Sequence, residues 1–408
     1  MTAVDSLAVP SVLIAEPDPW TCDLLKQMVL SVRCDAQLDV CQEGPQALTL
    51  LKQKTYDLVI ADGKLPGIGG LDLLRRVRQL RRSPLQPFIL LSERSDSASV
   101  REALPLAPTA YLTKPLDMSG LTLRLQTLLL RAGQAVSCDV PALSPGMTLK
   151  EFLAQRRTSC DGAPLSVDVH AVVKQSMGPV GLDLGLLEQY AHTDPQIGAV
   201  LIAAVNSAAR HRTSPTQTLG QALQGLGATQ SVNLIQGLAL KQSAYLTDPC
   251  LSDYAQQQWA VSLRTAEYGR TLAGILNLDK ARCYYAGLLH RIGDLAVLRC
   301  LQEWQLAGGE LDTQVIDASL AEFAAAYGSA LRTRWRLPLE LRELIAAIYH
   351  LGGGVYSREA LVMSMAAQVA NLASDDGIES LAESKTARLL KVGPLELARL
   401  VKKQSPSP

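Results

Sequence analysis

Polar side chains that could hold a metal ion and a phosphoryl group follow several short apolar runs of the chain. Glu16 and Asp18 come after the first run, Asp62 after a later one, and Ser92 and Lys114 after two more. Carboxylates bind Mg²⁺ well, while a hydroxyl and an ammonium group can contact phosphate oxygens. If the fold gathers these five side chains, the sequence predicts a Mg²⁺-dependent phosphoryl site.

The elements that would gather them alternate between short apolar runs and helical periods. Five predicted strands span residues 12–15, 37–41, 58–61, 88–91 and 110–112, and the helices that follow them span 20–30, 45–52, 71–80, 97–104 and 121–130. Strands that alternate with helices are typical of a parallel, doubly wound sheet. In such sheets the functional site lies beyond the carboxyl ends of the strands, where the polar side chains are expected.

Two longer motifs around these residues resemble a known family. Residues 56–70 read Tyr-Asp-Leu-Val-Ile-Ala-Asp-Gly-Lys-Leu-Pro-Gly-Ile-Gly-Gly, and residues 110–115 read Ala-Tyr-Leu-Thr-Lys-Pro. Residues 11–132 thereby resemble the receiver domain of two-component response regulators. The resemblance implies that Asp62 accepts a phosphoryl group and that Lys114 is its counter-charge. It also implies that Ser92 and Tyr111 form the switch pair.

One position departs from the pattern of that family. The family usually carries two adjacent acids after its first strand, the second binding Mg²⁺ directly, whereas this sequence reads Glu16-Pro17-Asp18. Pro17 offers no side-chain oxygen, so Asp18 could replace the missing acid only through a shift of the loop. Two interpretations follow. Either Glu16, Asp18 and Asp62 hold Mg²⁺ at a working phosphosite, or the receiver is degenerate and belongs to a phosphorylation-independent adaptor.

A second domain is predicted after a linker that contains Pro, Ser and Gly. The linker spans residues 133–147, and Thr148 to Glu151 fit a capping box that opens a helix. Apolar stripes with a helical period follow at residues 197–205, 219–226, 232–240, 261–276, 284–298 and 339–348. They predict an all-α domain over 148–375, followed by a helical C-terminal segment and tail over 376–408. The fold class is therefore α/β plus all-α.

Short motifs in this second domain point to its family and its chemistry. The motifs are residues 193–195, 204–208, 219–227, 286–295 and 335–338. In that order they resemble an HDOD domain, a signalling relative of the HD metal phosphohydrolases. Such hydrolases hold metal with an adjacent His-Asp pair and further ligands, but here the pair is His290-Arg291, and a guanidinium repels a divalent cation. We expect a non-catalytic domain, with a residual metal-dependent phosphohydrolase as the alternative.

Composition narrows the function classes further. Lys and Arg number 39, and so do Asp and Glu, so the formal net charge is zero and direct binding to nucleic acid or an anionic membrane is not expected. The sequence shows no leader with a basic and then an apolar part, and no apolar run of about 18 residues. Its eight cysteines show no Cys-x-x-Cys spacing. These features predict a cytoplasmic protein with reduced, mostly buried thiols.

The resemblance of the two domains to a receiver and an HDOD domain implies a signal-transduction response regulator rather than an enzyme. A histidine kinase would phosphorylate it on Asp62, with Mg²⁺ as the cofactor of the receiver. Its output would be contact between the HDOD domain and a downstream signalling protein, or a second copy of the chain as a homodimer.

Overall fold

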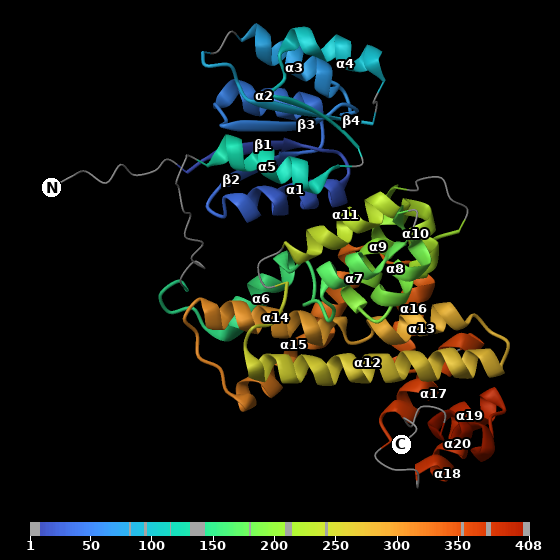
Figure 1. The fold of residues 1–408 in the computed structure, drawn as a ribbon. Coiled ribbons are helices and arrows are strands. Elements are labelled where there is room, and N and C mark those ends of the chain that lie inside the picture. Colours follow the sequence, from blue (N-terminus) through green and yellow to red (C-terminus); the bar gives the residue numbers. More distant parts are fainter. Residues whose placement is uncertain are drawn as a thin grey trace. The chain divides into compact units, whose positions relative to one another are not determined.

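The computed structural model describes residues 9–80, 83–93, 96–114, 116–130, 143–178, 181–208, 214–240, 244–351, 355–372 and 377–402. Contacts within the chain define two units, Met1–Asp139 with Thr229–Lys241, and Val140–Ala228 with Gln242–Pro408. The first unit contains the predicted receiver, and the second contains most of the helices (Figure 1). The helix α11 (Ala228–Ala239) falls largely in the first unit, although the sequence analysis placed it in the second domain.

A five-stranded parallel sheet is the centre of the first unit, as the sequence predicts. Its strands are β1 (Ser11–Ala15), β2 (Gln37–Cys41), β3 (Leu58–Asp62), β4 (Phe88–Ser92) and β5 (Ala110–Thr113). They lie in the order β2-β1-β3-β4-β5, and Val12 of β1 pairs with Leu38 on one side and Leu58 on the other. The chain passes from β1 to β2 on one side of β1 and then returns to β3 on the other side. The strand order therefore reverses at β1 and β3, and this is the switch point of the sheet.

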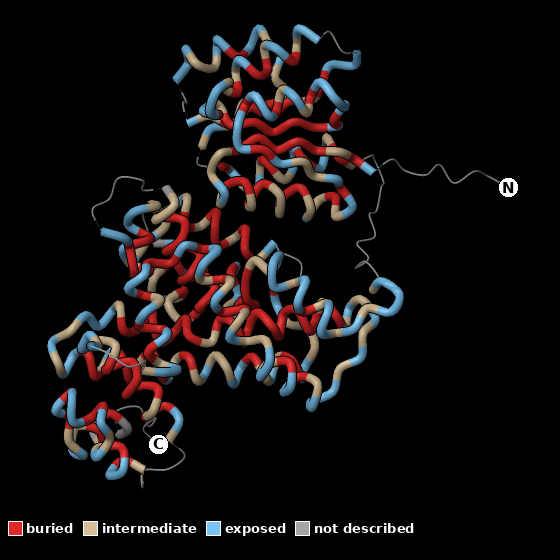
Figure 2. The backbone as a smooth tube through the Cα atoms, turned by 180° about the vertical axis from the view of Figure 1, so that it is seen from behind, coloured by how far each residue is buried: buried red, intermediate tan, exposed pale blue. Residues whose placement is uncertain are grey.

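Helices cover both faces of this sheet because its central strands are apolar on both sides. Val12 and Ile14 share a core with α1 (Pro19–Val32) and α5 (Met118–Leu129). Leu13 and Ala15 share the other core with α2 (Gly44–Gln53), α3 (Gly70–Gln79) and α4 (Ser97–Ala103). Successive side chains of a strand point to opposite faces, so one apolar run supplies two cores. Figure 2 shows the buried strands between helices whose outer surfaces are exposed.

The predicted strands agree with the observed ones to within one residue at each end. The helices agree less well at their starts, and α5 begins at Met118, three residues before the predicted start. Ser119 and Gly120 are polar or small, so the first turn of α5 carries no apolar period from which it could be predicted. The chain after β4 also forms a short 3₁₀ turn, Leu104–Leu106, directly after α4.

The described part of the second unit is mainly helical, which confirms the predicted fold class. Its long helices are α12 (Pro249–Ile275), α14 (Ile292–Leu306) and α15 (Thr313–Arg334). The remaining helices outside α11 are α6 (Leu149–Ser159), α7 (Val169–Gln175), α8 (Leu184–Ala191), α9 (Pro195–Ala208), α10 (Leu219–Leu226), α13 (Lys280–Leu289), α16 (Leu339–Tyr349), α17 (Arg358–Ala370), α18 (Gly377–Ala382), α19 (Lys385–Leu390) and α20 (Pro394–Lys402). The predicted capping box of Thr148 and Glu151 opens α6.

Three features of this unit differ from the sequence prediction. Two short antiparallel strands, β6 (Met177–Gly178) and β7 (Gly181–Leu182), interrupt the helices. The helix predicted over residues 261–276 starts earlier, at Pro249, because Asp248 accepts a hydrogen bond from the backbone N–H of Leu251 at 2.9 Å and caps it. The helix predicted over residues 284–298 is divided into α13 and α14.

The thiols partly depart from the expected reduced state. Cys22, Cys41, Cys283 and Cys300 are buried free thiols, Cys160 is half-buried and Cys250 is exposed. Cys34 is disulfide-bonded, which corrects the expectation for this residue, because folding can join cysteines whose sequence spacing shows no pattern. Cys138 lies outside the described residues. No helix in the described ranges has the length and apolarity that crossing a membrane requires.

Candidate functional site

Three charged side chains meet at the carboxyl edge of the sheet, where the sequence predicts a phosphoryl site. Glu16 directly follows β1, Asp62 ends β3 and Lys114 directly follows β5. Lys114 Nζ lies 2.8 Å from Glu16 Oε2 and also forms an ion pair with Asp62 Oδ2. Glu16 and Asp62 are only 1% and 4% exposed, so their charges are compensated mainly by Lys114 rather than by water.

The strand order explains why residues so distant in sequence converge. β1 and β3 are neighbours, so Glu16 and Asp62 lie at adjacent strand ends. β5 is separated from β3 by β4, and the long side chain of Lys114 spans that distance. The backbone N–H of Lys114 donates to Ser92 O at 2.7 Å, which fixes the base of the lysine at the end of β4.

Burial changes the acid–base behaviour of this group of three. Burial raises the pKa of Glu16 to about 7, although Lys114 acts in the opposite direction, and Asp62 raises that pKa further. Burial alone would lower the pKa of Lys114, but the carboxylates of Glu16 and Asp62 raise it above its ordinary value. Lys114 is therefore an ammonium at neutral pH, while Glu16 changes charge near neutrality.

Asp18, the third predicted metal ligand, forms the N-cap of α1. Its Oδ2 accepts hydrogen bonds from the backbone N–H and the hydroxyl of Thr21, at 2.8 and 2.7 Å. Pro19 follows at the first helical position, where its fixed φ favours the helix. The backbone N–H of Asp18 donates to Glu16 Oε1 at 3.1 Å. Asp18 thus orients Glu16 through its backbone while its carboxylate holds the helix.

Glu16 and Asp62 supply two carboxylates that could serve as ligands for Mg²⁺. Across the described ranges, no group of three or more His, Cys, Asp or Glu side chains is placed to hold a metal ion. Mg²⁺ keeps several waters and requires only one or two protein carboxylates together with phosphate oxygens. Glu16 and Asp62 fit that requirement, whereas the carboxylate of Asp18 is occupied by the helix cap.

The other predicted residues are Ser92, on the strand next to that of Asp62, and Tyr111, one strand further along the sheet. Ser92 ends β4, and Tyr111 lies in β5, half-buried against the core that includes α2 and α3. Lys64 is not among the predicted site residues, yet its backbone N–H donates to Asp62 Oδ1 at 2.5 Å and its ammonium pairs with Glu93. Its position two residues after Asp62, in the turn that follows β3, is the signal that could have identified it.

In the second unit, His290 lies at the break between α13 and α14. A Cβ on Gly287 would lie 2.5 Å from Ala266 Cα, and a Cβ on Gly293 would lie 2.1 Å from Ala324 O. Only glycine permits such close approaches, so α13 packs at backbone distance against α12, and α14 does so against α15. The chain changes direction between the two contacts, which explains why one predicted helix is divided at His290.

His290 is buried beside a cation. Its ring Nδ1 lies 2.6 Å from Gly287 O, and the hydroxyl of Tyr349 donates to its backbone carbonyl at 2.5 Å. Burial lowers the pKa of His290 to about 4, and the charge of Arg291 lowers it further. Arg291 pairs with Asp294 at 3.2 Å, so this carboxylate is engaged by a guanidinium. The imidazole is neutral at physiological pH, and its Nδ1 is held by the backbone.

Two family models match parts of this chain. Residues 12–126 match the response regulator receiver domain, and residues 164–351 match the HDOD domain. The chain joins a receiver domain to an HDOD domain.

Known proteins are similar to parts of this receiver–HDOD chain. The regulatory protein VanRB of Enterococcus faecalis is 32% identical over 154 residues, which are 38% of this chain and 66% of that protein. The receiver domain of the Francisella response regulator 1452 is 27% identical, with a TM-score of 0.27 over 30% of this chain and 98% of its own. A receiver domain of an HD domain-containing protein from Pseudomonas fluorescens Pf-5 is 29% identical, with a TM-score of 0.27 over 30% of this chain and 95% of its own. The chain spans between about half and two thirds of the length of the first curated relatives.

Substitutions of Asp18 distinguish its role as a helix cap from a role as a metal ligand. Asp18→Asn keeps an oxygen that can accept from Thr21, so its free energy of unfolding should change by less than about 0.5 kcal/mol, and Mg²⁺ affinity should be unchanged. Asp18→Ala removes the cap and should cost about 1 kcal/mol. Urea unfolding and calorimetric Mg²⁺ titration measure the two effects. A marked loss of Mg²⁺ affinity in Asp18→Asn would show instead that Asp18 binds the ion.

The raised pKa of Glu16 predicts a pH dependence of stability. Its pKa is about 7 in the folded protein against an ordinary value of 4.5, so the folded state binds more protons than the unfolded state between these values. Folding stability therefore falls as pH rises through this window. Glu16→Gln removes this titrating group. As pH rises from about 4.5 to about 7, the free energy of unfolding of the variant should therefore rise relative to that of the unchanged protein, by at most about 3 kcal/mol. Above this window the difference should stay constant.

Urea unfolding in the absence of divalent cations, at several pH values from about 5 to 8, measures this difference. Glu43→Gln is the matched control, because Glu43 is an exposed glutamate of the same domain. The curve of this variant shows what the loss of a glutamate charge at the surface does by itself. A Glu16→Gln curve that runs parallel to the unchanged protein would contradict the raised pKa.

Proposed function

We propose that this protein is a response regulator that accepts a phosphoryl group on Asp62 and passes the signal on through protein contacts of its HDOD domain. The observation that carries the proposal is the ammonium of Lys114, which pairs with both Asp62 and Glu16. A fixed cation beside the accepting carboxylate stabilises the charge of an incoming phosphoryl group. Glu16 keeps that cation in place while Asp62 reacts.

The proposed transfer forms one bond and breaks another. An oxygen of Asp62 attacks the phosphorus of a phosphohistidine in the donor kinase, and the N–P bond breaks with its electron pair going to the imidazole. The product is an acyl phosphate on Asp62, which Lys114 and the hydroxyl of Ser92 contact. Mg²⁺, when bound by Glu16 and Asp62, neutralises phosphoryl charge. Tyr111, half-buried in β5, then changes its packing and alters the outer surface of the domain.

Phosphorylation can be tested with a small phosphoryl donor. Acetyl phosphate with Mg²⁺ should add one phosphoryl group to the full chain, because Asp62 and Lys114 supply the acceptor and its counter-charge. Intact-mass spectrometry measures the addition. Asp62→Asn should remain unlabelled, and Asp72→Asn, at an exposed aspartate of the same domain, should be labelled like the unchanged protein. No added mass at saturating donor would favour the phosphorylation-independent adaptor with a degenerate receiver.

The HDOD domain is proposed to signal without hydrolysis. A neutral, backbone-bound His290 followed by a guanidinium does not reproduce the adjacent His-Asp pair of an HD metal centre. Signalling then depends on contact, with a histidine kinase as the input partner and a downstream protein or a second copy of the chain as the output partner. A formal net charge of zero argues against nucleic acid or an anionic membrane as a direct partner. The cytoplasm is the proposed location.

The absence of hydrolysis is a measurable expectation. The purified full chain should bind no stoichiometric transition metal and should leave cyclic dinucleotides intact, because Arg291 replaces a metal ligand with a cation. Elemental analysis measures the metal, and chromatography of the nucleotides measures turnover. Turnover that disappears in His290→Ala while the helical content is retained would establish the alternative, a residual metal-dependent phosphohydrolase.

A further inference from the structure

Two cysteines that are far apart in the sequence meet where α6 ends. Cys160 is the C-cap residue of α6, and Cys300 lies in the middle of α14. Their side chains share a hydrogen bond. Cys160 is half-buried, whereas Cys300 is only 2% exposed, so a reagent from solution reaches Cys160 first.

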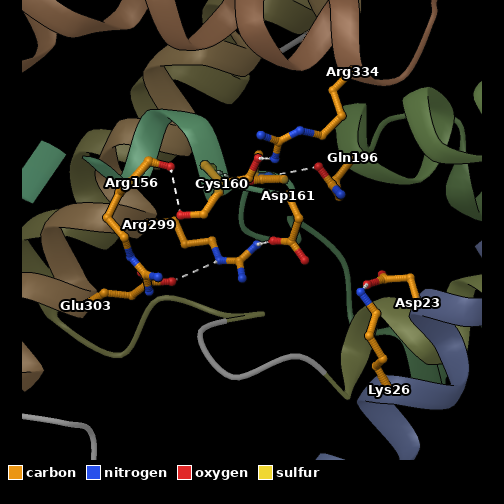
Figure 3. Close-up of polar contacts among 12 residues, drawn as sticks. Asp23, Lys26, Arg156, Cys160, Asp161, Gln196, Arg299, Glu303 and Arg334 are labelled. Carbon is orange, nitrogen blue, oxygen red and sulfur yellow. Dashed lines mark hydrogen bonds and ion pairs between the residues drawn. The ribbon is translucent and has the colours of Figure 1, made fainter. Parts of the chain in front are cut away.

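The charges around Cys160 favour its thiolate form. Figure 3 shows the guanidinium groups of Arg156, Arg299 and Arg334 around this residue, together with the carboxylates of Asp161 and Glu303. Arg299 pairs with Asp161 at 3.0 Å and with Glu303 at 3.7 Å, and Arg156 also pairs with Glu303. Arg299 therefore favours a negative charge on the sulfur of Cys160, while Asp161 opposes it.

Arg334 offsets the partial negative charge at the C-terminal end of α6, which would otherwise disfavour a thiolate on Cys160. The C-terminal end of a helix carries partial negative charge on its unpaired carbonyl oxygens, which disfavours an anion there. The guanidinium of Arg334 donates to the carbonyls of Thr158 and Cys160 at the end of α6. These bonds satisfy the carbonyls and place a cation beside them.

The two thiols differ in their acid–base behaviour. The hydrogen bond from Cys300 lowers the pKa of Cys160, as does the charge of Arg299, against the opposing effect of burial. The same hydrogen bond, together with burial, raises the pKa of Cys300 well above its ordinary value. Cys300 keeps its proton and donates it toward Cys160. The protonated Cys160 thiol donates to Gly162 O at 3.3 Å, a bond that is lost when the thiolate forms. Cys160 is thus the better nucleophile of the two.

Other described thiols lack this combination. Burial raises the pKa of Cys22 and of Cys41 to about 11, and that of Cys283 to about 12. Such thiols are almost entirely protonated at neutral pH and react slowly with oxidants. Cys250 is exposed, which makes it the natural comparison for access to solvent.

We propose that Cys160 and Cys300 are a peroxide-sensitive pair that forms a reversible disulfide between α6 and α14. The Cys160 thiolate attacks a peroxide oxygen, the O–O bond breaks, and Cys160 becomes a sulfenic acid while hydroxide takes a proton to form water. The sulfur of Cys300 then attacks the sulfenic sulfur, the S–O bond breaks, and a second water leaves. Two thiols are oxidised and one hydrogen peroxide is reduced to two waters.

The bond would fix covalently a helix that is now held by non-covalent contacts. The hydroxyl of Tyr327 donates to Leu153 O at 2.7 Å, and Arg156 forms its ion pair with Glu303 of α14. Tyr327 is fully buried and also hydrogen-bonds with Cys300, so the thiol pair lies in the same packed junction of α6, α14 and α15. Oxidation would stiffen this junction, and a dithiol reductant would release it.

Peptide mapping tests the proposal on the full chain. The protein is reduced, freed of reductant, treated with hydrogen peroxide, alkylated and digested with trypsin without reduction. Cys160 then lies in residues 158–174 and Cys300 in residues 300–332, and neither peptide contains another cysteine. We expect these two peptides linked, and we expect the link to be lost on reduction. Cys160→Ser should abolish the linked species, and Cys250→Ser should retain it.

A second variant keeps the test decisive if loss of a buried thiol affects folding. Cys300→Ser, with its helical content checked by circular dichroism, should accumulate a sulfenic acid on Cys160 that a dimedone probe captures. Asp62→Asn should still form the disulfide, which separates this proposal from phosphorylation. Alkylated, unlinked Cys160 in the folded protein, at peroxide concentrations that oxidise Cys250, would overturn the proposal.

Discussion

Two carboxylates buried at the edge of a sheet must share one ammonium, and the receiver site depends on that constraint. When Glu16, Asp62 and Lys114 are all ionised, the group retains one negative charge in a place that is almost closed to water. An uncompensated buried charge is unfavourable by several kcal/mol, so the group reduces its charge by protonating Glu16, whose pKa is about 7. A phosphoryl group adds still more negative charge, which is the physical reason why a divalent cation belongs in the proposed reaction.

The sequence could predict this group because strand ends are easy to locate and parallel strands bring their carboxyl ends together. It could not decide the role of Asp18 from spacing alone, since an aspartate two residues after Glu16 suits either a metal site or a helix start. Asp18-Pro19 does carry the signature of an N-cap followed by proline at the first helical position. The hydrogen bonds to Thr21 favour the helix start.

The helix break at His290 lies beyond what periodicity can reveal. The apolar pattern of residues 284–298 continues across the break, so it predicts one helix. The break results from Gly287 and Gly293, which allow α13 and α14 to approach different partner helices at backbone distance. The partner helices are known only from the tertiary fold. A glycine within a helical pattern does not indicate which helix will pack against it. The motif around His290 was therefore visible in the sequence, but its geometry was not.

In both units, charged side chains gather at the ends of strands or helices, but the two groups of side chains favour additional charges of opposite sign. In the receiver, one ammonium faces two carboxylates, and the surplus is negative. At the end of α6, the guanidinium of Arg299 favours a negative charge on the sulfur of Cys160. A negative surplus suits a place that receives a cation together with a phosphoryl group, whereas a nearby guanidinium suits a thiolate. The same requirement for local neutrality thus favours phosphoryl chemistry at Asp62 and thiol chemistry at Cys160.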